Sequence, residues 1–215
     1  MKGEALEFTY RAQPMRVLFR SGAVPDAVCD EVALLGLGRV LVLCDDHGLD
    51  TARAVAASLG DACAGLHAGA VAHVPVEVAD LAVETAREAR ADGCVAVGGG
   101  SVTGLAKAVA LRTGLPIVAV PTTYAGSEMT PVWGLTEGAV KRTGRDPKVL
   151  PRSVVYDERL GIPRSLAELG LTAADVDRAV EVALGAPYAN PRPASADDLR
   201  TVLHAAWAGE PPYGG

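Results

Sequence analysis

The stretch CVAVGGGSVTGLAKAVALRTG, residues 94–114, decides the fold of this chain. Its first four residues are small or apolar, as in a strand that is buried on both faces. Three glycines follow, and residues 101–112 then carry apolar side chains at helical spacing. A glycine turn that leads from a strand into a helix brings unpaired N–H groups and a partial positive charge to one point, which suits a pyrophosphate.

We therefore interpret Gly98-Gly99-Gly100-Ser101 as a phosphate-binding turn for a dinucleotide. In an open parallel sheet, ligands bind beyond the carboxyl ends of the strands, which is where this turn is expected to lie. A tight turn without a ligand is the alternative, because the ordinary GxGxxG signature is absent.

Strand and helix patterns alternate on both sides of this unit. The predicted strands are residues 8–10, 16–19, 39–44, 63–66, 94–97, 117–120 and 154–156, and the predicted helices are 25–35, 49–59, one opened by Pro75, and 101–112. The first two strands are expected to form a hairpin. The alternation predicts an α/β fold with a Rossmann-like, mostly parallel sheet and helices on both faces.

After Asp157 only helix signals remain. Thr172 can cap one helix, and Ser195 with Asp198 resembles a capping box at the start of another. We predict a dinucleotide-binding α/β domain over residues 1–158 and a short C-terminal helical segment over 159–215.

Polar side chains follow the strands at the expected ligand edge. Thr122, Thr123 and Ser127 belong to a hydroxyl-rich loop after strand 117–120, and they could donate to ribose, phosphate or a carboxamide. A polar surface loop is the alternative. Asp45 follows strand 39–44 and could accept from an adenosine ribose hydroxyl, which would favour NAD over NADP. A helix-capping acid is an equally good interpretation of Asp45.

Lys141 lies downstream in a basic loop with Arg142 and Arg145, and it could reach a cofactor ribose or a carboxylate substrate. A solvated loop lysine is the alternative. His73 could face the cleft, although a surface-loop histidine is the better interpretation. The sequence has 4 His and 4 Cys without metal-ligand spacing, so we expect no metal site, and we assign no catalytic residue.

Composition narrows the class of protein. The chain has 215 residues, 49% of them hydrophobic, and a formal net charge of -6, which disfavours nucleic acid as a partner. Neither a signal peptide nor a membrane span is recognisable in the sequence, and the separated cysteines suit a reducing compartment. We expect a cytoplasmic protein that does not bind membranes.

The segment from Cys94 to Gly138, CVAVGGGSVTGLAKAVALRTGLPIVAVPTTYAGSEMTPVWGLTEG, resembles the iron-containing (group III) alcohol dehydrogenase superfamily. The superfamily motif GGGSxxD has Gly104 here in place of its acid. That replacement, together with PTTYAGSEMTP and residues 144–151, is similar to the maleylacetate reductase branch. The resemblance extends from about Leu6 to about Leu160.

The resemblance implies NADH-dependent reduction of maleylacetate, or a chloromaleylacetate, to 3-oxoadipate in the breakdown of aromatic compounds. It implies NAD(H) as cofactor, with NADP(H) as the alternative, and a homodimer that acts on a small oxo acid. It places Gly98, Gly99, Gly100 and Ser101 on the pyrophosphate, Thr122, Thr123 and Ser127 on the nicotinamide side, Asp45 on the adenosine ribose and Lys141 near the nicotinamide ribose.

The same resemblance implies that most of a helical domain is missing. Residues 161–207 are similar to the C-terminal end of the maleylacetate reductase branch, so the helices that carry its metal and substrate residues have no counterpart here. Two alternatives to an active reductase follow: a catalytically impaired nucleotide-binding remnant of such an enzyme, or a repurposed oxidoreductase of the superfamily.

Overall fold

The computed structural model describes residues 13–22, 24–160, 165–185 and 194–210. The strand predicted at residues 94–97 lies inside a six-stranded parallel sheet. β4 (Gly93–Gly98) pairs with β2 (Val40–Cys44) on one side and β5 (Ile117–Pro121) on the other. The full order is β1-β8-β5-β4-β2-β3, with β1 (Arg16–Phe19), β3 (Cys63–His67) and β8 (Ser153–Tyr156). The α/β expectation is confirmed.

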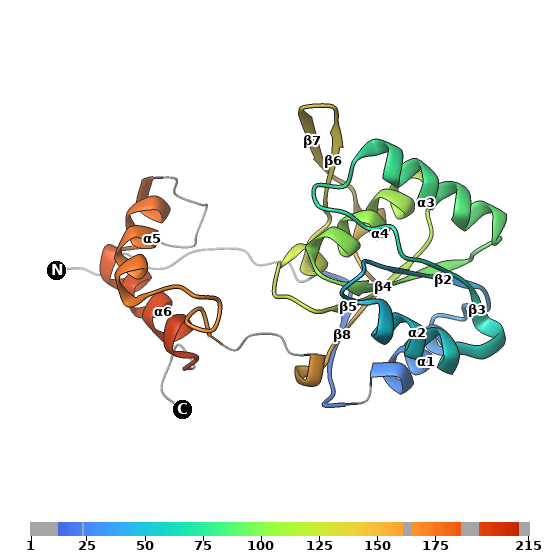
Figure 1. Cartoon of the computed structure of the whole chain (residues 1–215), viewed down its shortest axis with the longest axis horizontal. Helices are drawn as coiled ribbons and strands as arrows, with labels where there is room; N and C mark the ends of the chain where they lie inside the picture. Colours follow the sequence, from blue (N-terminus) through green and yellow to red (C-terminus); the bar gives the residue numbers. More distant parts are fainter. Residues whose placement is uncertain (1–12, 23, 161–164, 186–193, 211–215) are drawn as a thin grey trace. The chain divides into compact units, whose positions relative to one another are not determined.

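Helices cover both faces of this sheet (Figure 1). α1 (Val24–Leu34) and α2 (Leu49–Leu59) lie on one face, and α3 (Val76–Glu88) and α4 (Gly100–Thr113) lie on the other. Alternate residues of β4 enter the two cores: Val95 packs with α1 and α2, whereas Ala96 packs with α3 and α4. Continuous apolar strands are therefore required, because each strand is covered on both faces.

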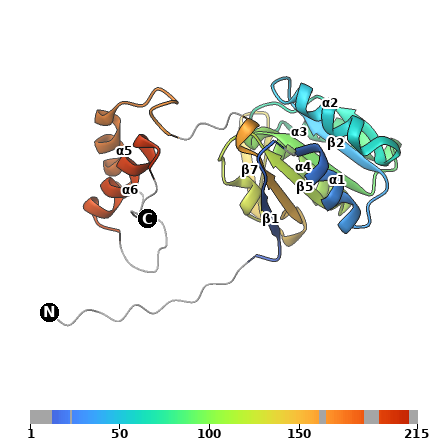
Figure 2. The ribbon, with the colours of Figure 1, turned by 90° about the horizontal axis from the view of Figure 1, so that it is seen from below.

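β1 is an edge strand, and Figure 2 shows it from below. It pairs in parallel with β8, while its expected hairpin partner at 8–10 lies outside the described residues. The Glu31 carboxylate of α1 accepts hydrogen bonds from Arg16 Nε at 3.0 Å and from Ser153 Oγ at 2.5 Å. This buried carboxylate thus joins α1 to β1 and β8.

β6 (Val132–Glu137) and β7 (Val140–Arg145) form an antiparallel hairpin that was not predicted from the sequence. Lys141, Arg142 and Arg145 were expected in a basic loop, and that expectation was wrong because they lie on β7. Gly138 adopts a φ of +59° at the first turn position, where glycine permits a two-residue hairpin turn. The Gly-Ala pair at 138–139 is the signal that could have identified this turn.

The described C-terminal residues form a separate compact unit, which we call the helical unit; residues 14–160 form the sheet unit. It contains α5 (Ala173–Gly185) and α6 (Ala196–Ala208). Ser195 and Asp198 form the predicted capping box, with each side chain bonded to the other residue's backbone N–H. No helix among the described residues is long and apolar enough to cross a membrane.

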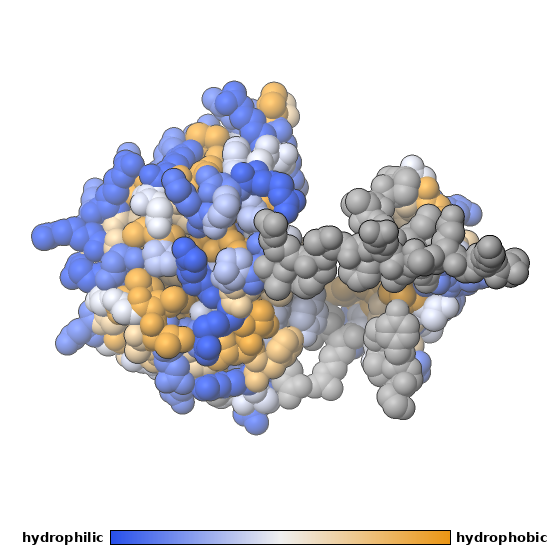
Figure 3. Space-filling model, turned by 180° about the vertical axis from the view of Figure 1, so that it is seen from behind, coloured by the Kyte–Doolittle hydropathy of each residue, from blue (hydrophilic) through white to orange (hydrophobic). Residues whose placement is uncertain are grey.

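Four short 3-10 helices occur among the described residues: η1 (Gly60–Ala62), η2 (Ser127–Met129), η3 (Pro147–Val149) and η4 (Glu158–Leu160). The surface of the sheet unit retains exposed large apolar side chains, including Phe19, Leu81 and Tyr124. Figure 3 shows apolar patches, in orange, among hydrophilic ones on one face of this unit.

Candidate functional site

Only glycine fits at the first position of the glycine turn, Gly98. β4 ends at Gly98, whose φ is +153°, and a Cβ there would collide with the Val102 side chain. A Cβ on Gly99 would lie 3.2 Å from Thr123 Oγ1. α4 begins at Gly100, and its first N–H groups lack partners within the helix, so the turn offers donors to an anion.

A cleft of about 780 Å³ lies beside this turn. Its walls come from the turn and α4, the loop after β5, the β6–β7 hairpin and the segment before α3. Of the described residues that line it, His73 and Lys141 carry titratable side chains that can be positive, and none carries a carboxylate. The chain has a net charge of -6, yet the described lining of this cleft has no acidic side chain. The local charge in the cleft therefore favours an anionic ligand.

The hydroxyl loop is joined to the glycine turn. The Thr122 N–H donates to the Gly98 carbonyl at 3.1 Å, and the Thr123 side chain faces Gly99. Ser127 begins η2 and lines the cleft together with Ser101. The structure therefore brings the hydroxyl loop and the turn to one place, and their role toward a cofactor stays a prediction.

Asp45 lies beside the turn but outside the cleft lining. Its Oδ1 accepts from the Gly48 N–H at 2.9 Å in the turn before α2, but α2 has no side-chain cap hydrogen bond, so Asp45 does not cap that helix as the alternative interpretation expected. Its Oδ2 is 3.6 Å from the position that a Cβ on Gly98 would take. One carboxylate thus bonds the turn before α2 and also approaches the end of β4.

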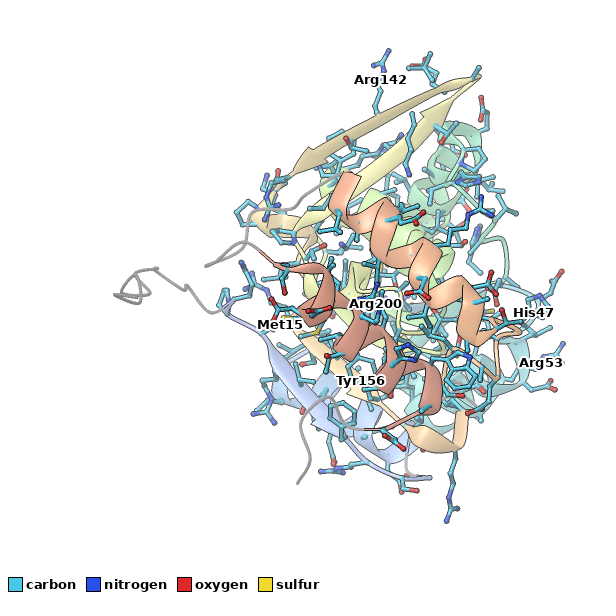
Figure 4. All side chains as sticks on the ribbon, turned by 90° about the vertical axis from the view of Figure 1, so that its left-hand side faces the viewer. Met15, His47, Arg53, Arg142, Tyr156 and Arg200 are labelled. Carbon is cyan, nitrogen blue, oxygen red and sulfur yellow. The ribbon has the colours of Figure 1, made fainter. Side chains whose placement is uncertain are left out.

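Lys141 lies on β7 and lines the cleft. Its Cε is 3.3 Å from the position that a Cβ on Gly134 would take, so the absence of a side chain at Gly134 gives the lysine its path across the hairpin. The neighbouring Arg142 projects from the hairpin, as Figure 4 shows, and it pairs with Glu137 at 2.9 Å.

The hairpin also holds a strained segment of the cleft wall. His73 and Val74 have φ values of +65° and +47°, which are uncommon for residues other than glycine and a true outlier for a β-branched one. Thr136 of β6 holds both: its Oγ1 donates to the His73 carbonyl at 2.8 Å and its N–H to the Val74 carbonyl at 3.1 Å. His73, interpreted above as a surface-loop residue, is exposed and also lines the cleft.

Gly104 also lines the cleft, and a Cβ there would be 2.8 Å from Val74 Cγ2. An acid at this position would have to displace Val74, so the glycine and the strained valine fit each other.

Sequence reasoning missed a buried polar cluster behind the loop. Lys107 and Glu128 are each 1% exposed. The Glu128 carboxylate accepts from the Tyr156 hydroxyl at 2.6 Å. Burial, and then the Glu128 carboxylate, raise the pKa of Tyr156, so this hydroxyl remains a donor. The signal for this cluster was Lys107, a charged residue on an otherwise apolar face of α4.

Among the described residues, no three His, Cys, Asp or Glu side chains come together as a possible metal site. The parts of the chain that the structure describes therefore do not fit an iron ion.

Comparison with known proteins gives consistent matches. Residues 14–158 match the family model for iron-containing alcohol dehydrogenase. Maleylacetate reductase 2 of Cupriavidus pinatubonensis is 54% identical over 157 residues, which are 73% of this chain and 44% of that protein. The chain spans about half the length of the curated relatives that it matches.

Solved structures agree with this match. Maleylacetate reductase from Agrobacterium tumefaciens superposes with a TM-score of 0.68 at 28% identity, over 95% of this chain and 99% of that one. Sulfoacetaldehyde reductase from Bifidobacterium kashiwanohense, solved in complex with NAD+, shares the fold with a TM-score of 0.70 at 22% identity, over 91% of this chain and 57% of that one.

Proposed function

The chain belongs to the iron-containing alcohol dehydrogenase family, and we propose from this that it binds NADH in the cleft beside Gly98–Ser101 and reduces maleylacetate, or a chloromaleylacetate, to 3-oxoadipate. The observation that carries the proposal is the glycine turn at the wall of a cleft without lining carboxylates. The names of the similar proteins support the substrate, a small unsaturated oxo acid.

Three walls of the cleft have a part in holding the cofactor: the start of α4, the hydroxyl loop and the β6–β7 hairpin. The N–H groups at the start of α4 bind the pyrophosphate, and Ser101 adds a hydroxyl donor. Lys141 reaches the ribose on the nicotinamide side from β7, while Ser127 orients the ring from the hydroxyl loop. Thr122 and Thr123 lie outside the cleft lining, beside Gly98 and Gly99, and support the glycine turn from there. NADH supplies a hydride when bound.

Asp45 selects the cofactor. A carboxylate beside the end of β4 accepts from a ribose hydroxyl and repels a 2′-phosphate, so NADH is expected to bind more tightly than NADPH. Equal affinities for NADH and NADPH would contradict the role proposed for Asp45, but not the role proposed for the glycine turn.

A second candidate function is nucleotide binding without turnover. It is favoured by one observation: the described lining of the cleft comes from the sheet unit alone. A cleft built from one domain excludes water poorly and orients a substrate poorly. A superfamily oxidoreductase with another substrate is the third candidate.

Two measurements on the full chain separate these candidates. NADH is titrated while its fluorescence is followed, and NADH oxidation is then followed by absorbance after maleylacetate is added. Binding with turnover supports the reductase, and turnover with a different oxo acid supports the repurposed enzyme. Binding without turnover supports the second candidate, and failure to bind NADH would contradict the proposed site.

A further inference from the structure

Lys107 extends from α4 into a cage of backbone carbonyls. Its Nζ donates to the carbonyl oxygens of Ser127 at 2.6 Å, Thr130 at 2.7 Å and Val132 at 2.7 Å. The side chain is 1% exposed, so water does not compete for these bonds. One buried nitrogen thus joins α4 to two residues of the loop between β5 and β6 and to Val132, the first residue of β6.

The cage matches the charged form of the amine. An ammonium group has three N–H donors, one for each carbonyl, whereas a neutral amine has two. Burial lowers the pKa of Lys107 to about 8, and the Glu128 carboxylate opposes that shift. The ammonium form therefore predominates at neutral pH, where its three bonds to the loop are charge-assisted.

The anchored residues are also residues of the cleft wall. Ser127, Thr130 and Val132, whose carbonyls accept from Lys107 Nζ, all line the cleft. Other bonds hold the loop as well: the Thr130 N–H donates to the Ser127 carbonyl at 3.2 Å within it, and the Asp146 N–H donates to the Pro131 carbonyl at 3.0 Å from the segment after β7. A further long-range bond runs from the Tyr156 hydroxyl of β8 to the Glu128 carboxylate.

We propose that Lys107 is a positioning residue for the cofactor: it holds residues 127–132 in the conformation that receives the nicotinamide half of NADH. This inference rests on the proposed function of the cleft. Lys107 does not touch the cofactor, because its nitrogen is enclosed by the loop that it anchors. The adenosine and pyrophosphate half depends instead on the glycine turn, and none of the carbonyls that Lys107 Nζ bonds belongs to that turn.

The test compares two ligands. NADH and ADP are titrated against the full chain and against Lys107→Met, which keeps the length of the side chain but removes every donor. We expect NADH affinity to fall about tenfold or more, since three buried carbonyls lose their partner, while ADP affinity stays within about twofold. Lys148→Met, at an exposed lysine of η3, is the control and should change neither affinity.

A parallel loss of NADH and ADP affinity would show that Lys107 is merely structural, and unchanged NADH affinity would also overturn the proposal. Should Lys107→Met fail to fold, Lys107→Ala with added propylammonium replaces it. Propylammonium should restore NADH affinity by filling the cage, whereas tetramethylammonium, which has no N–H donor, should not. Equal effects of the two ions would reject the cage.

Hydrogen exchange without cofactor separates this inference from the proposed function. The Met129 and Thr130 amides of Lys107→Met should exchange faster than in the original chain, while those of β4 stay protected. If the original chain binds no NADH, the proposed function fails, yet faster exchange would still establish the anchor. Unchanged exchange at both amides would refute the anchor even if NADH binds.

Discussion

At the scale of single residues, backbone conformation and close neighbours decide which side chains the glycine turn tolerates. Gly98 has a positive φ and Val102 above it, so neither its conformation nor its surroundings admit a side chain. Gly99, with a φ of -78°, has an ordinary conformation, but a Cβ there would lie 3.2 Å from Thr123 Oγ1, so the Thr123 side chain would have to shift slightly. Asp and Asn at this position make the same steric demand, so a comparison of the two isolates the effect of charge.

We expect Gly99→Asp to weaken NADH binding at least about 100-fold. A carboxylate about 4 Å from a phosphate costs roughly 4 kcal/mol at partly screened sites, and each 1.4 kcal/mol is tenfold in affinity. The Gly99→Asn variant has the same shape without the charge and is expected to lose much less in the same fluorescence titration. Equal affinities of the two variants would argue against a pyrophosphate at this turn.

At the scale of elements, the sheet unit relies on side chains that join neighbouring pieces of the chain. Glu31 joins α1 to β1 and β8, Thr136 joins β6 to the segment before α3, and Lys107 joins α4 to the loop after β5. Each of these bonds crosses a long separation in sequence, so each depends on the completed fold.

Acid should weaken the Glu31 connection. Burial raises the pKa of the Glu31 carboxyl, but hydrogen bonds from Arg16 and Ser153 outweigh it and hold the pKa below the ordinary 4.5. The stabilisation is therefore complete above pH 4.5 and is lost as the pH falls through the lower folded-state value. Thermal unfolding between pH 3 and pH 7 should show this loss.

In Glu31→Gln the same decline should be shallower, and the melting temperature at pH 7 should be about 2–6 °C lower, because a charge-assisted network is lost. Asp50→Asn, at an exposed carboxylate of α2, serves as the control. An identical pH profile for the original chain and Glu31→Gln would rule out this role.

The hairpin should control the shape of the cleft through Thr136. Thr136→Val keeps the volume but removes the hydroxyl that holds the His73 carbonyl, so the strained backbone of residues 73–74 can relax. We expect NADH affinity to fall about three- to tenfold, as for one lost hydrogen bond. Thr136→Ser retains the hydroxyl and should bind NADH normally; a loss in both variants would point to packing instead.

At the scale of the whole molecule, the sheet unit presents aromatic side chains at one end of the sheet. Phe19 is 72% exposed, and its ring stacks on the Tyr156 ring with 4.9 Å between the ring centroids. Tyr124 is 62% exposed, and its ring centroid lies 5.6 Å from that of Tyr156. Exposed apolar groups of this kind favour self-association. A homodimer therefore remains our proposal for the protein.

We expect Phe19→Ser to shift the chain toward the monomer in light scattering coupled to size-exclusion chromatography, because it removes the most exposed ring of this cluster. Leu81→Ser, at a 57% exposed position on α3, is the matched control and should leave the mass unchanged. A monomeric original chain, or a dimer that survives Phe19→Ser, would contradict this assignment.

The sequence by itself determined the parallel sheet, its helices and the position of the glycine turn. Continuous apolar runs such as Val40–Cys44 and the helical periodicity after Ser101 are local signals. Each depends only on which faces of the element are buried, and not on which other elements cover them. The Ser195–Asp198 capping box is local in the same sense. The comparison with the family agrees with these elements over residues 14–158.

Only the tertiary structure decided how the cleft is built. The β6–β7 hairpin, the strained His73–Val74 segment and the Lys107 cage depend on contacts between residues far apart in the chain. No pattern within one segment encodes which carbonyls meet at Lys107, since a buried ammonium is acceptable only where three acceptors converge on it. The position of the glycine turn follows from local sequence, whereas the cleft beside it, where we propose that the cofactor binds, forms only when these distant segments pack together.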